Sequence, residues 1–311
     1  MKHVLVHGAS IGELLAAETV VAGLRDRHPD LRVTYSYTSR SVARWPSWPA
    51  DAVERLPFPT ATRLTPWLRG LDPDALLLSR GDLWPGLLRA AARGGIPAIV
   101  IGGRIGAESR RLRWPWRLGY RRAAAGLAWV GAVTEEDASR WVRLGVPRER
   151  VTVTGDPAVD RLLAYRPRQA IVDAIRTWAK GEPVLVVGSM EPSDRAAVAA
   201  LLAQTPRALI VPHDPERLRL PWPAWSGDGP LPEASHVAAP RRGILLDCYH
   251  AAAAAYVGGG HTGRLHSVLE PVAAGVPVVQ GPEDRDRALA ALEASRGATG
   301  RTLPIIARVS S

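Results

Sequence analysis

Acidic and hydroxyl side chains follow the first apolar run of the sequence, where they could take part in acid–base chemistry. Residues 7–13 read HGASIGE and come directly after Val4-Leu5-Val6. The glycines permit a tight turn and the close approach of a ligand, and a helix that begins here exposes free N–H groups. Glu13 would lie in the first helical turn, where its carboxylate could act as a general base. Ser10 and Glu13 also have the spacing of a capping box, in which the carboxylate only accepts a backbone hydrogen bond.

A second acidic residue, Asp82, follows another apolar run. Residues 79–85 read SRGDLWP and come after the run at residues 75–78. Asp82 lies near the expected start of a helix, with Pro85 in its first turn. It could bind a ligand or only cap that helix, and Trp84 is expected to pack against the core.

Glycines follow two apolar runs in the second half of the chain. Gly188 and Ser189 come after residues 184–187, and three consecutive glycines, 258–260, come after residues 254–257. A glycine run leaves backbone N–H groups bare for phosphate oxygens, and a following helix start adds its dipole. Glu270, one helical turn further, could accept hydrogen bonds from ribose hydroxyls. The Walker pattern GxxxxGK[ST] is absent.

The histidines and the cysteine give little indication of a metal. His261 and His266 are five residues apart, which is not the i,i+4 spacing that places two ligands on one helix face, and no neighbouring carboxylate or cysteine completes the set. Cys248 is the single cysteine, so an internal disulfide is excluded. We therefore expect no metal and no cofactor.

Short apolar runs alternate with longer helical patterns along the whole chain, which indicates parallel sheets built from strand–helix–strand units. The predicted fold class is α/β, with two doubly wound Rossmann-like domains that face a central cleft. Strands are expected in the second domain at 184–189, 208–211, 243–246, 254–257 and 276–279. We place the N-terminal domain at 1–155, a linker at 156–180 and the C-terminal domain at 181–311. Ligands of such sheets bind beyond the carboxyl ends of the strands.

The net charge of +10 comes almost entirely from arginine, because only Lys2 and Lys180 among the 40 basic residues are lysines. The densest basic segment runs from Arg104 to Arg122 and is interleaved with Trp114 and Trp116. It could bind lipid headgroup phosphates with the indoles at the interface, or it could be a solvated helix face. No apolar stretch reaches the ~20 residues of a membrane span, and residues 1–4 lead into the first strand without a signal-peptide pattern.

Four segments together resemble the 3-deoxy-D-manno-octulosonic acid (Kdo) transferases of lipopolysaccharide biosynthesis, which have the GT-B glycosyltransferase fold. They are HGASIGE at 7–13, DLWP at 82–85, TGDPAVD at 154–160 and LEPxxAGVPVxxGP at 269–282. They occur in the family's order, and the similarity runs from His7 to about Pro282, which is most of the chain.

The resemblance implies a glycosyltransferase that moves Kdo from CMP-Kdo to a lipid A precursor with inversion and without a metal or cofactor. It places the catalytic base on Glu13 and the acceptor-binding residues on Ser10, Gly12, Asp82 and Arg104. The donor-binding residues implied by the resemblance, together with the glycine positions above, are Gly188, Ser189, Pro212, His213, Gly258, Gly259, Gly260, His266, Ser267, Val268, Leu269 and Glu270. The expected location is the cytoplasmic face of the inner membrane, with peripheral contact through the segment from Arg104 to Arg122. We expect no nucleic-acid partner.

The chain departs from the family pattern in several places. The family usually has an arginine at the position of His213, a His-Asn pair at 266–267, a glutamate at the position of Arg80 and a lysine at that of Ala158. Its helical anchor before the first strand has no counterpart here, so the basic segment is expected to substitute for it. Two alternatives therefore remain: a GT-B glycosyltransferase with another nucleotide-sugar donor or acceptor, and a non-catalytic module that binds anions or lipids.

Overall fold

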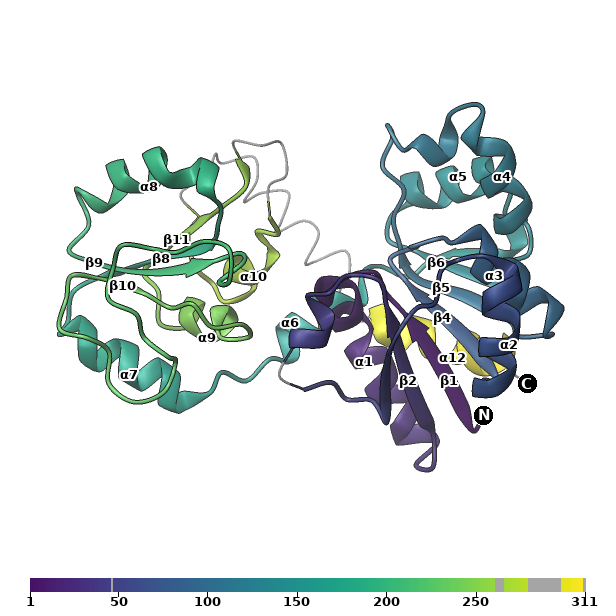
Figure 1. Ribbon diagram of the computed structural model, residues 1–311, viewed down its shortest axis with the longest axis horizontal. Coiled ribbons are helices and arrows are strands. Elements are labelled where there is room, and N and C mark those ends of the chain that lie inside the picture. The colour runs from purple at the N-terminus through teal and green to yellow at the C-terminus, as the bar shows by residue number, and fades with distance from the viewer. Residues whose placement is uncertain (46, 261–265, 279–297, 310–311) are drawn as a thin grey trace. The chain divides into compact units, whose positions relative to one another are not determined.

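The computed structural model describes residues 1–45, 47–260, 266–278 and 298–309 (Figure 1). The chain divides into two compact units, Met1–Arg161 with Ala294–Ser311, and Leu162–Glu293. Each unit is an α/β structure with one parallel sheet. The predicted fold class, two Rossmann-like halves of the GT-B type, is confirmed.

The first unit is built on seven parallel strands in the order β3-β2-β1-β4-β5-β6-β7. The central strands are buried on both faces because helices cover both sides. In β4, Leu76 and Leu78 join the cluster below α2 and α3, whereas Ala75 and Leu77 join the cluster below α1. The strands are β1 (His3–His7), β2 (Arg32–Tyr37), β3 (Ala52–Arg55), β4 (Ala75–Ser79), β5 (Ala98–Gly103), β6 (Trp129–Ala132) and β7 (Val151–Val153).

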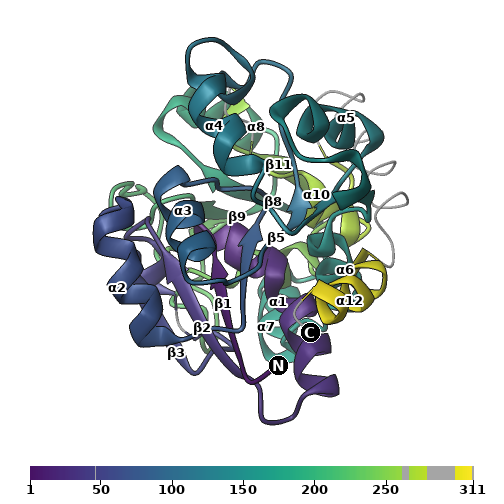
Figure 2. The same cartoon turned by 90° about the vertical axis from the view of Figure 1, so that its right-hand side faces the viewer.

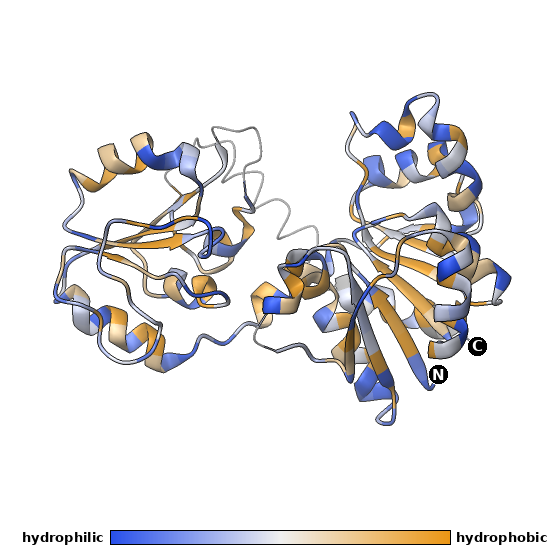
Figure 3. Ribbon diagram, viewed as in Figure 1, coloured by the Kyte–Doolittle hydropathy of each residue, from blue (hydrophilic) through white to orange (hydrophobic). Residues whose placement is uncertain are grey.

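The buried apolar residues of the helices in this unit pack in the same two clusters as the strands, whose ribbons are largely apolar in Figure 3. The helices are α1 (Ile11–Arg27), α2 (Ala61–Leu71), α3 (Pro85–Arg93), α4 (Trp116–Ala124), α5 (Glu135–Leu144), α6 (Pro157–Ala164), whose end lies past the unit boundary, and α12 (Ala298–Val309), with short 3₁₀ turns at Val42–Arg44, Arg110–Leu112 and Arg148–Arg150.

The second unit has four parallel strands in the order β10-β9-β8-β11. They are β8 (Val184–Met190), β9 (Arg207–Pro212), β10 (His236–Ala238) and β11 (Ala254–Val257). Its helices are α7 (Gln169–Ala179), α8 (Arg195–Leu202), α9 (Leu245–Tyr249) and α10 (Leu269–Ala273), with a 3₁₀ turn at Pro192–Asp194.

One expected strand of the second unit, at 243–246, is wrong. Leu245–Tyr249 is the short helix α9, and the strand of this region is β10, earlier in the sequence. A short apolar run does not distinguish a buried strand from a buried helix by periodicity. Val278 forms a single parallel bridge with Ala255, and the end of the expected strand, residue 279, lies outside the described residues.

The division into units differs from the expected ranges 1–155, 156–180 and 181–311. Helix α12 belongs to the first unit, where it runs beside α1 (Figures 1 and 2). Leu303 and Ile306 are buried in the same cluster as the inner face of α1, and the Thr299 hydroxyl donates to the hydroxyl of Thr19 over 2.9 Å. The expected linker is itself helical, and α7 packs on α9.

No helix in the described ranges is both long enough and apolar enough to cross a membrane.

Candidate active site and nucleotide-binding residues

Glu13 lies in the first turn of α1, at the carboxyl end of β1. Its carboxylate accepts hydrogen bonds from the backbone N–H groups of Ala9 and, over 3.2 Å, of Ser10. This is the backbone contact that the capping interpretation requires. Gly8 lets the turn pass close to α1, because a Cβ at this position would lie 3.0 Å from the Cβ of Glu13. At Gly12 a Cβ would meet nothing within 4 Å, so the space beside the first turn is open.

Asp82 and His7 lie beside Glu13, from the ends of β4 and β1. Nε2 of His7 is 3.3 Å from Oδ2 of Asp82, and the indole of Trp84 donates to the same oxygen over 2.8 Å. The other ring nitrogen of His7 is 2.9 Å from the hydroxyl of Ser36. His7 is fully buried, and the sequence did not single it out as a site residue. Sequence spacing cannot reveal the contact of His7 with Asp82, because it joins the ends of two strands that are neighbours only in the folded sheet.

The pKa values of the Glu13 and Asp82 carboxyl groups are shifted in opposite directions. Burial raises the pKa of Glu13, and the negative charge of Asp82 adds to this, against the hydrogen bonds from Ala9 and Ser10. Burial would also raise the pKa of Asp82, but the contacts with His7 and Trp84 outweigh it, so this pKa is lowered. Two neighbouring carboxyl groups with opposite shifts are the usual arrangement of an acid–base site. Glu13 therefore keeps its proton to a higher pH than Asp82 does.

Arg104 forms its ion pair with a buried carboxylate, Asp156, rather than with Glu13 or Asp82. Oδ2 of Asp156 accepts hydrogen bonds from Arg104 over 2.9 Å and from Arg80 over 3.2 Å. Asp156 has no exposed surface, whereas both guanidinium groups are partly exposed. Its other oxygen accepts from the N–H of Ala158. Asp156 therefore holds two cations at the carboxyl edge of the first sheet, a role that the sequence did not indicate.

The glycines of the second unit are needed for close packing. Gly188 lies against Tyr249, whose hydroxyl would be 1.9 Å from an added Cβ. At Gly258 a Cβ would lie 2.3 Å from the carbonyl oxygen of Ser189. Ser189 itself has a positive φ of 51°.

The expectation of bare amides in this glycine run is wrong for its first two members. The N–H of Gly258 donates to the carbonyl of Gly188 over 2.9 Å. The N–H of Gly259 donates to both carboxylate oxygens of the fully buried Asp194, at 3.2 and 3.1 Å. Asp194 thus occupies the anion position at the Gly259 amide. Gly260 lies at the exposed end of the run.

His213 and His266 are 53 positions apart in the sequence but stack on each other. Their ring centroids are 4.1 Å apart with an interplanar angle of 21°. Nε2 of His266 is 2.9 Å from a carboxylate oxygen of Glu191, a residue that the sequence did not indicate. Burial and the nearby His266 and Arg242 lower the pKa of His213. The negative charges of Glu191 and Asp214 partly oppose this shift. The preceding residue, Pro212, is buried at the end of β9.

The remaining expected donor-binding residues form the start of α10. Ser267 is exposed, and its hydroxyl accepts the N–H of Leu269 over 3.4 Å. Val268 precedes the helix, the side chain of Leu269 is buried, and Glu270 lies half-buried in the first turn. Residues 261–265 and 279–282, which complete the glycine-rich and LEP motifs, lie outside the described residues.

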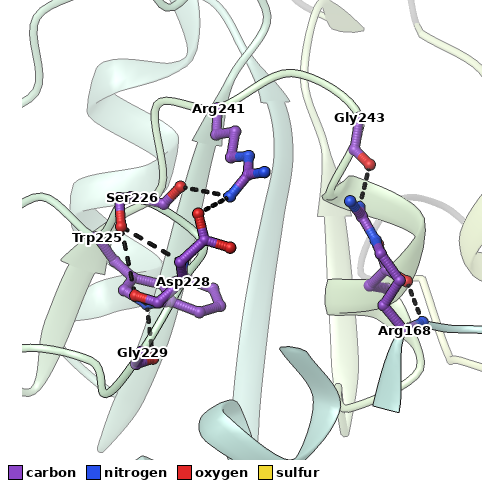
Figure 4. Close-up of polar contacts among 8 residues, drawn as sticks. Arg168, Trp225, Ser226, Asp228, Gly229, Arg241 and Gly243 are labelled. Atoms are coloured by element: carbon purple, nitrogen blue, oxygen red, sulfur yellow. Dashed lines mark hydrogen bonds and ion pairs between the residues drawn. The ribbon is translucent and has the colours of Figure 1, made fainter. Parts of the chain in front are cut away.

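Ion pairs and a buried indole hold the loops between β9 and α9 (Figure 4). Arg241 donates to the carbonyl of Ser226 over 3.1 Å and forms an ion pair with Asp228 at 2.5 Å. Trp225 is buried and donates to the carbonyls of Asp228 and Gly229. Arg168 binds the carbonyl of Gly243 and the buried Asp247. These contacts hold the loop at 225–229 against Arg241 and tie the segment before α7 to Gly243 and α9.

The segment Arg110–Arg122, here called the Arg/Trp segment, forms an exposed basic and apolar surface. Trp114 is 80% exposed, and Trp116 and Leu118 are each 60% exposed. Arg111 is the exception, because it donates to the carbonyl of Gly81 over 2.6 Å. The exposed arginines of the segment are Arg110, Arg113, Arg117, Arg121 and Arg122.

Comparison with solved structures shows the same fold in proteins of low sequence identity. A putative UDP-N-acetylglucosamine 2-epimerase from Listeria monocytogenes superposes with a TM-score of 0.61 at 11% identity, covering 93% of this chain and 82% of that one. The glycotransferase of kitacinnamycin gives a TM-score of 0.59 at 17% identity, covering 99% and 98%. At such identities the similarity concerns the fold alone.

Comparison of sequences identifies the family. Residues 1–161 match the family model described as 3-deoxy-D-manno-octulosonic-acid transferase (kdotransferase). The 3-deoxy-D-manno-octulosonic acid transferase of Bordetella pertussis is 32% identical over 311 residues, covering 90% of this chain and 71% of the relative. The corresponding transferase of Chlamydia muridarum is 28% identical over 304 residues, covering 89% and 69%. The chain therefore belongs to the Kdo transferase family and is a glycosyltransferase.

Proposed function

We propose that this glycosyltransferase moves Kdo from CMP-Kdo to a hydroxyl group of a lipid A precursor, with inversion at the anomeric carbon. Its family supports Kdo transfer in lipopolysaccharide synthesis. The observation that carries the proposed chemistry is the half-buried Glu13 carboxylate at the end of β1, with its raised pKa. A base is most effective when its pKa approaches the working pH.

The proposed reaction is a single displacement. The ionised Glu13 carboxylate takes the proton of the acceptor hydroxyl as the oxygen attacks the anomeric carbon. The bond from that carbon to the phosphate oxygen of CMP breaks, and CMP leaves with the electron pair. Attack opposite the leaving group inverts the anomeric carbon. His7 acts as a positioning residue through its contact with Asp82, and the negative charge of Asp82 raises the pKa of Glu13.

Binding of the two substrates is assigned to different units in this proposal. On the first unit, Ser10, Gly12, Asp82 and the Asp156-bound Arg104 would bind the acceptor, which is anionic when it carries phosphate. On the second unit, the donor would contact His213, His266, Gly260 and the start of α10. The exposed surface of His213 and Ser267 supports this assignment.

Contact with the anionic cytoplasmic face of the inner membrane is proposed for the Arg/Trp segment. Two exposed indoles and a leucine stand among five exposed arginines. Indoles partition to the headgroup region, and each arginine near an anionic surface contributes about 1 kcal/mol.

The test of Glu13 as base is CMP release measured with Glu13→Gln. Glutamine keeps an oxygen that can accept from Ala9 and Ser10 but cannot take a proton, so capping and base catalysis are separated. General-base catalysis is worth about 10²–10⁴-fold, and we expect a loss of that size in kcat with an unchanged Tm. Glu18→Gln, further along α1 and paired with Arg161, is the matched control. Full turnover by Glu13→Gln would overturn the assignment.

A second candidate, another nucleotide-sugar donor, is favoured by one observation: His213 and His266 stack where the family pattern has an arginine and a histidine. Thermal shifts with CMP, CDP and UDP separate the two candidates. A ligand present at 100 times its Kd stabilises the protein by about 2.7 kcal/mol. Stabilisation by CMP alone supports CMP-Kdo, and stabilisation by UDP alone supports the other donor.

A further inference from the structure

Two arginines meet at one buried carboxylate at the carboxyl edge of the first sheet. Arg80 directly follows β4, Arg104 directly follows β5, and Asp156 comes after β7. Oδ2 of Asp156 accepts from Nη2 of Arg80 over 3.2 Å and from Nη2 of Arg104 over 2.9 Å, so the two guanidinium groups lie side by side. Strand β4 has β5 on one side and β1, which precedes the Glu13 turn, on the other. The arginine pair therefore lies at the same sheet edge as the proposed base.

The backbone of Arg80 is held in an unusual conformation. Its φ is 54°, in the left-handed region that residues other than glycine enter only at a cost. The N–H of Arg80 donates to the carbonyl of Ile101 over 2.9 Å, and its carbonyl accepts from the N–H of Arg104 over 3.4 Å. The next residue, Gly81, lies against Trp141, whose ring would be 2.8 Å from an added Cβ. These contacts fix the point from which the Arg80 side chain extends.

The two arginines supply more positive charge than the buried carboxylate requires. One guanidinium group balances the charge of Asp156, which also accepts the N–H of Ala158 over 3.0 Å. Among the residues that the structure describes, Asp156 is the ion-pair partner of both arginines, and neither has a second one. The side chains of Arg80 and Arg104 are 29% and 42% exposed. One positive charge is therefore left over on groups that a ligand can reach.

The hydrogen-bonding capacity of Arg80 is also incompletely used. Its Nε is buried and has no hydrogen-bond partner in the described part of the chain. A buried donor without an acceptor is costly. A guanidinium group is a planar fork of five N–H donors that matches the oxygens of a phosphate. A ligand with several oxygen atoms would satisfy donors that the protein leaves open.

We propose that Arg80 and Arg104 together bind a phosphate monoester, and that this group belongs to the acceptor. The assignment to the acceptor rests on the proposed function. A phosphate offers three acceptor oxygens and up to two negative charges, so two adjacent guanidinium groups favour it over a neutral hydroxyl. Arg80 is thus a specificity-determining residue that selects phosphorylated acceptors. The sequence could not show the pair, because its members and Asp156 follow three different strands.

Binding of glucosamine 1-phosphate to the full chain, with glucosamine as the neutral counterpart, tests the site. Isothermal titration calorimetry at low salt measures both affinities, and the native chain should bind the phosphorylated sugar more tightly. Arg80→Gln and Arg104→Gln should each weaken that binding by about 10–100-fold, the loss expected for one hydrogen bond to a charged group. Arg80→Lys keeps the charge without the fork and should retain part of the affinity. Equal affinity of the native chain for the two sugars would overturn the site.

Arg93→Gln is the matched control. Arg93 is exposed in the last turn of α3, at the opposite end of that helix from the turn that carries Arg80. This variant should bind glucosamine 1-phosphate with native affinity. In Arg80→Gln, Asp156 keeps Arg104 as its partner, so we expect a Tm close to that of the native chain. Native affinity in Arg80→Gln, or an equal loss in Arg93→Gln, would overturn the role of Arg80.

CMP identifies the source of the phosphate, because it also carries a phosphate monoester. Arg80→Gln should bind CMP as the native chain does, and an equal loss of affinity for CMP would overturn the assignment to the acceptor. Glu13→Gln should bind glucosamine 1-phosphate with native affinity, since the base is not part of the arginine pair. Failure of the phosphate site is therefore distinguishable from failure of Glu13 as base.

Turnover then separates binding from chemistry. With a phosphorylated lipid A precursor, Arg80→Gln should raise the KM for the acceptor about 10–100-fold and leave kcat nearly unchanged. With the dephosphorylated precursor, the native chain and Arg80→Gln should have similar KM values. A variant that keeps the native preference for the phosphorylated precursor would overturn Arg80 as the specificity-determining residue.

Discussion

At the scale of single residues, the capping contacts of Glu13 are compatible with its proposed role as the base. Its carboxylate binds the N–H groups at the start of α1, and burial together with Asp82 raises its pKa. A carboxyl group whose pKa is raised on folding disfavours the folded state when it ionises. The contribution of Glu13 to the free energy of unfolding is therefore greatest at low pH. It declines as the pH rises from the pKa of Glu13 in the unfolded chain toward its higher pKa in the folded protein.

Asp82→Asn is expected to move the acid limb of the pH–rate profile to lower pH. The Asp82 charge raises the pKa of Glu13, so removing it lowers that pKa, and the base stays ionised further into the acid range. The measurement is kcat/KM against pH. Asp173→Asn, an exposed site on α7, is the control. An unshifted limb in a folded Asp82→Asn protein would contradict the coupling.

At the scale of elements, close approaches of backbone and side chain shape the turns at the strand ends of the second unit. Position 188, inside β8, is a glycine because the hydroxyl of Tyr249, on α9, fills the space that a Cβ would take. Gly258 and Gly259 make backbone contacts to Gly188 and Asp194. Gly188, Gly258 and Gly259 thus allow the ends of β8 and β11 to pack closely, and Gly260 after them is exposed.

Gly188→Ala should lower the stability of the second unit. The new Cβ would lie 1.9 Å from the Tyr249 hydroxyl, and overpacking of this kind costs about 1–3 kcal/mol. Tyr249→Phe removes the hydroxyl and should restore part of the loss in the double variant. Denaturant unfolding measures the free energy of unfolding of the single and double variants. Gly106→Ala, where a Cβ meets nothing within 4 Å, is the control. Equal stability of Gly188→Ala and the native chain would be inconsistent with this packing.

Within the Arg/Trp segment, Trp116→Ser and Arg117→Gln should each weaken binding to vesicles containing an anionic phospholipid. Loss of one arginine near such a surface costs about 1 kcal/mol, or roughly fivefold in affinity. Sedimentation with vesicles at low and high salt measures the affinity of each variant for the vesicles, and added salt should reduce binding. Arg176→Gln, exposed on α7, should bind as the native chain does. Equal binding of all variants would show that the segment is only a solvated face.

At the scale of the whole molecule, the end of the chain returns to the unit in which it began. Helix α12 packs on α1 through Leu303 and Ile306, and the N–H of Thr299 donates to Asp160 over 2.7 Å. Gly23 on α1 permits the approach, since a Cβ there would lie 2.5 Å from Leu303. Residues at both ends of the described chain therefore stabilise the sheet that carries Glu13.

Ile306→Ala is expected to destabilise the first unit. Ile306 has no exposed surface, and truncation of a buried isoleucine to alanine costs about 2–5 kcal/mol. Thermal unfolding should show the first unit melting earlier. Asp26→Ala, at an exposed position of α1, should melt close to the native temperature. A melting temperature of Ile306→Ala equal to that of the control would mean that α12 contributes little.

The sequence by itself determined the α/β class, two Rossmann-like halves, the placement of Glu13 at a strand end and the family. These follow from local patterns: buried parallel strands are continuous apolar runs, and the turns after them carry the motifs. Only the tertiary structure decided that α12 joins the first unit, that Gly259 binds Asp194 rather than leaving a bare amide, and that His7 lies against Asp82. It also brought His213, His266 and Glu191 together. Each of these contacts joins positions far apart in sequence, and a parallel sheet makes them neighbours through strand order, which no local spacing encodes.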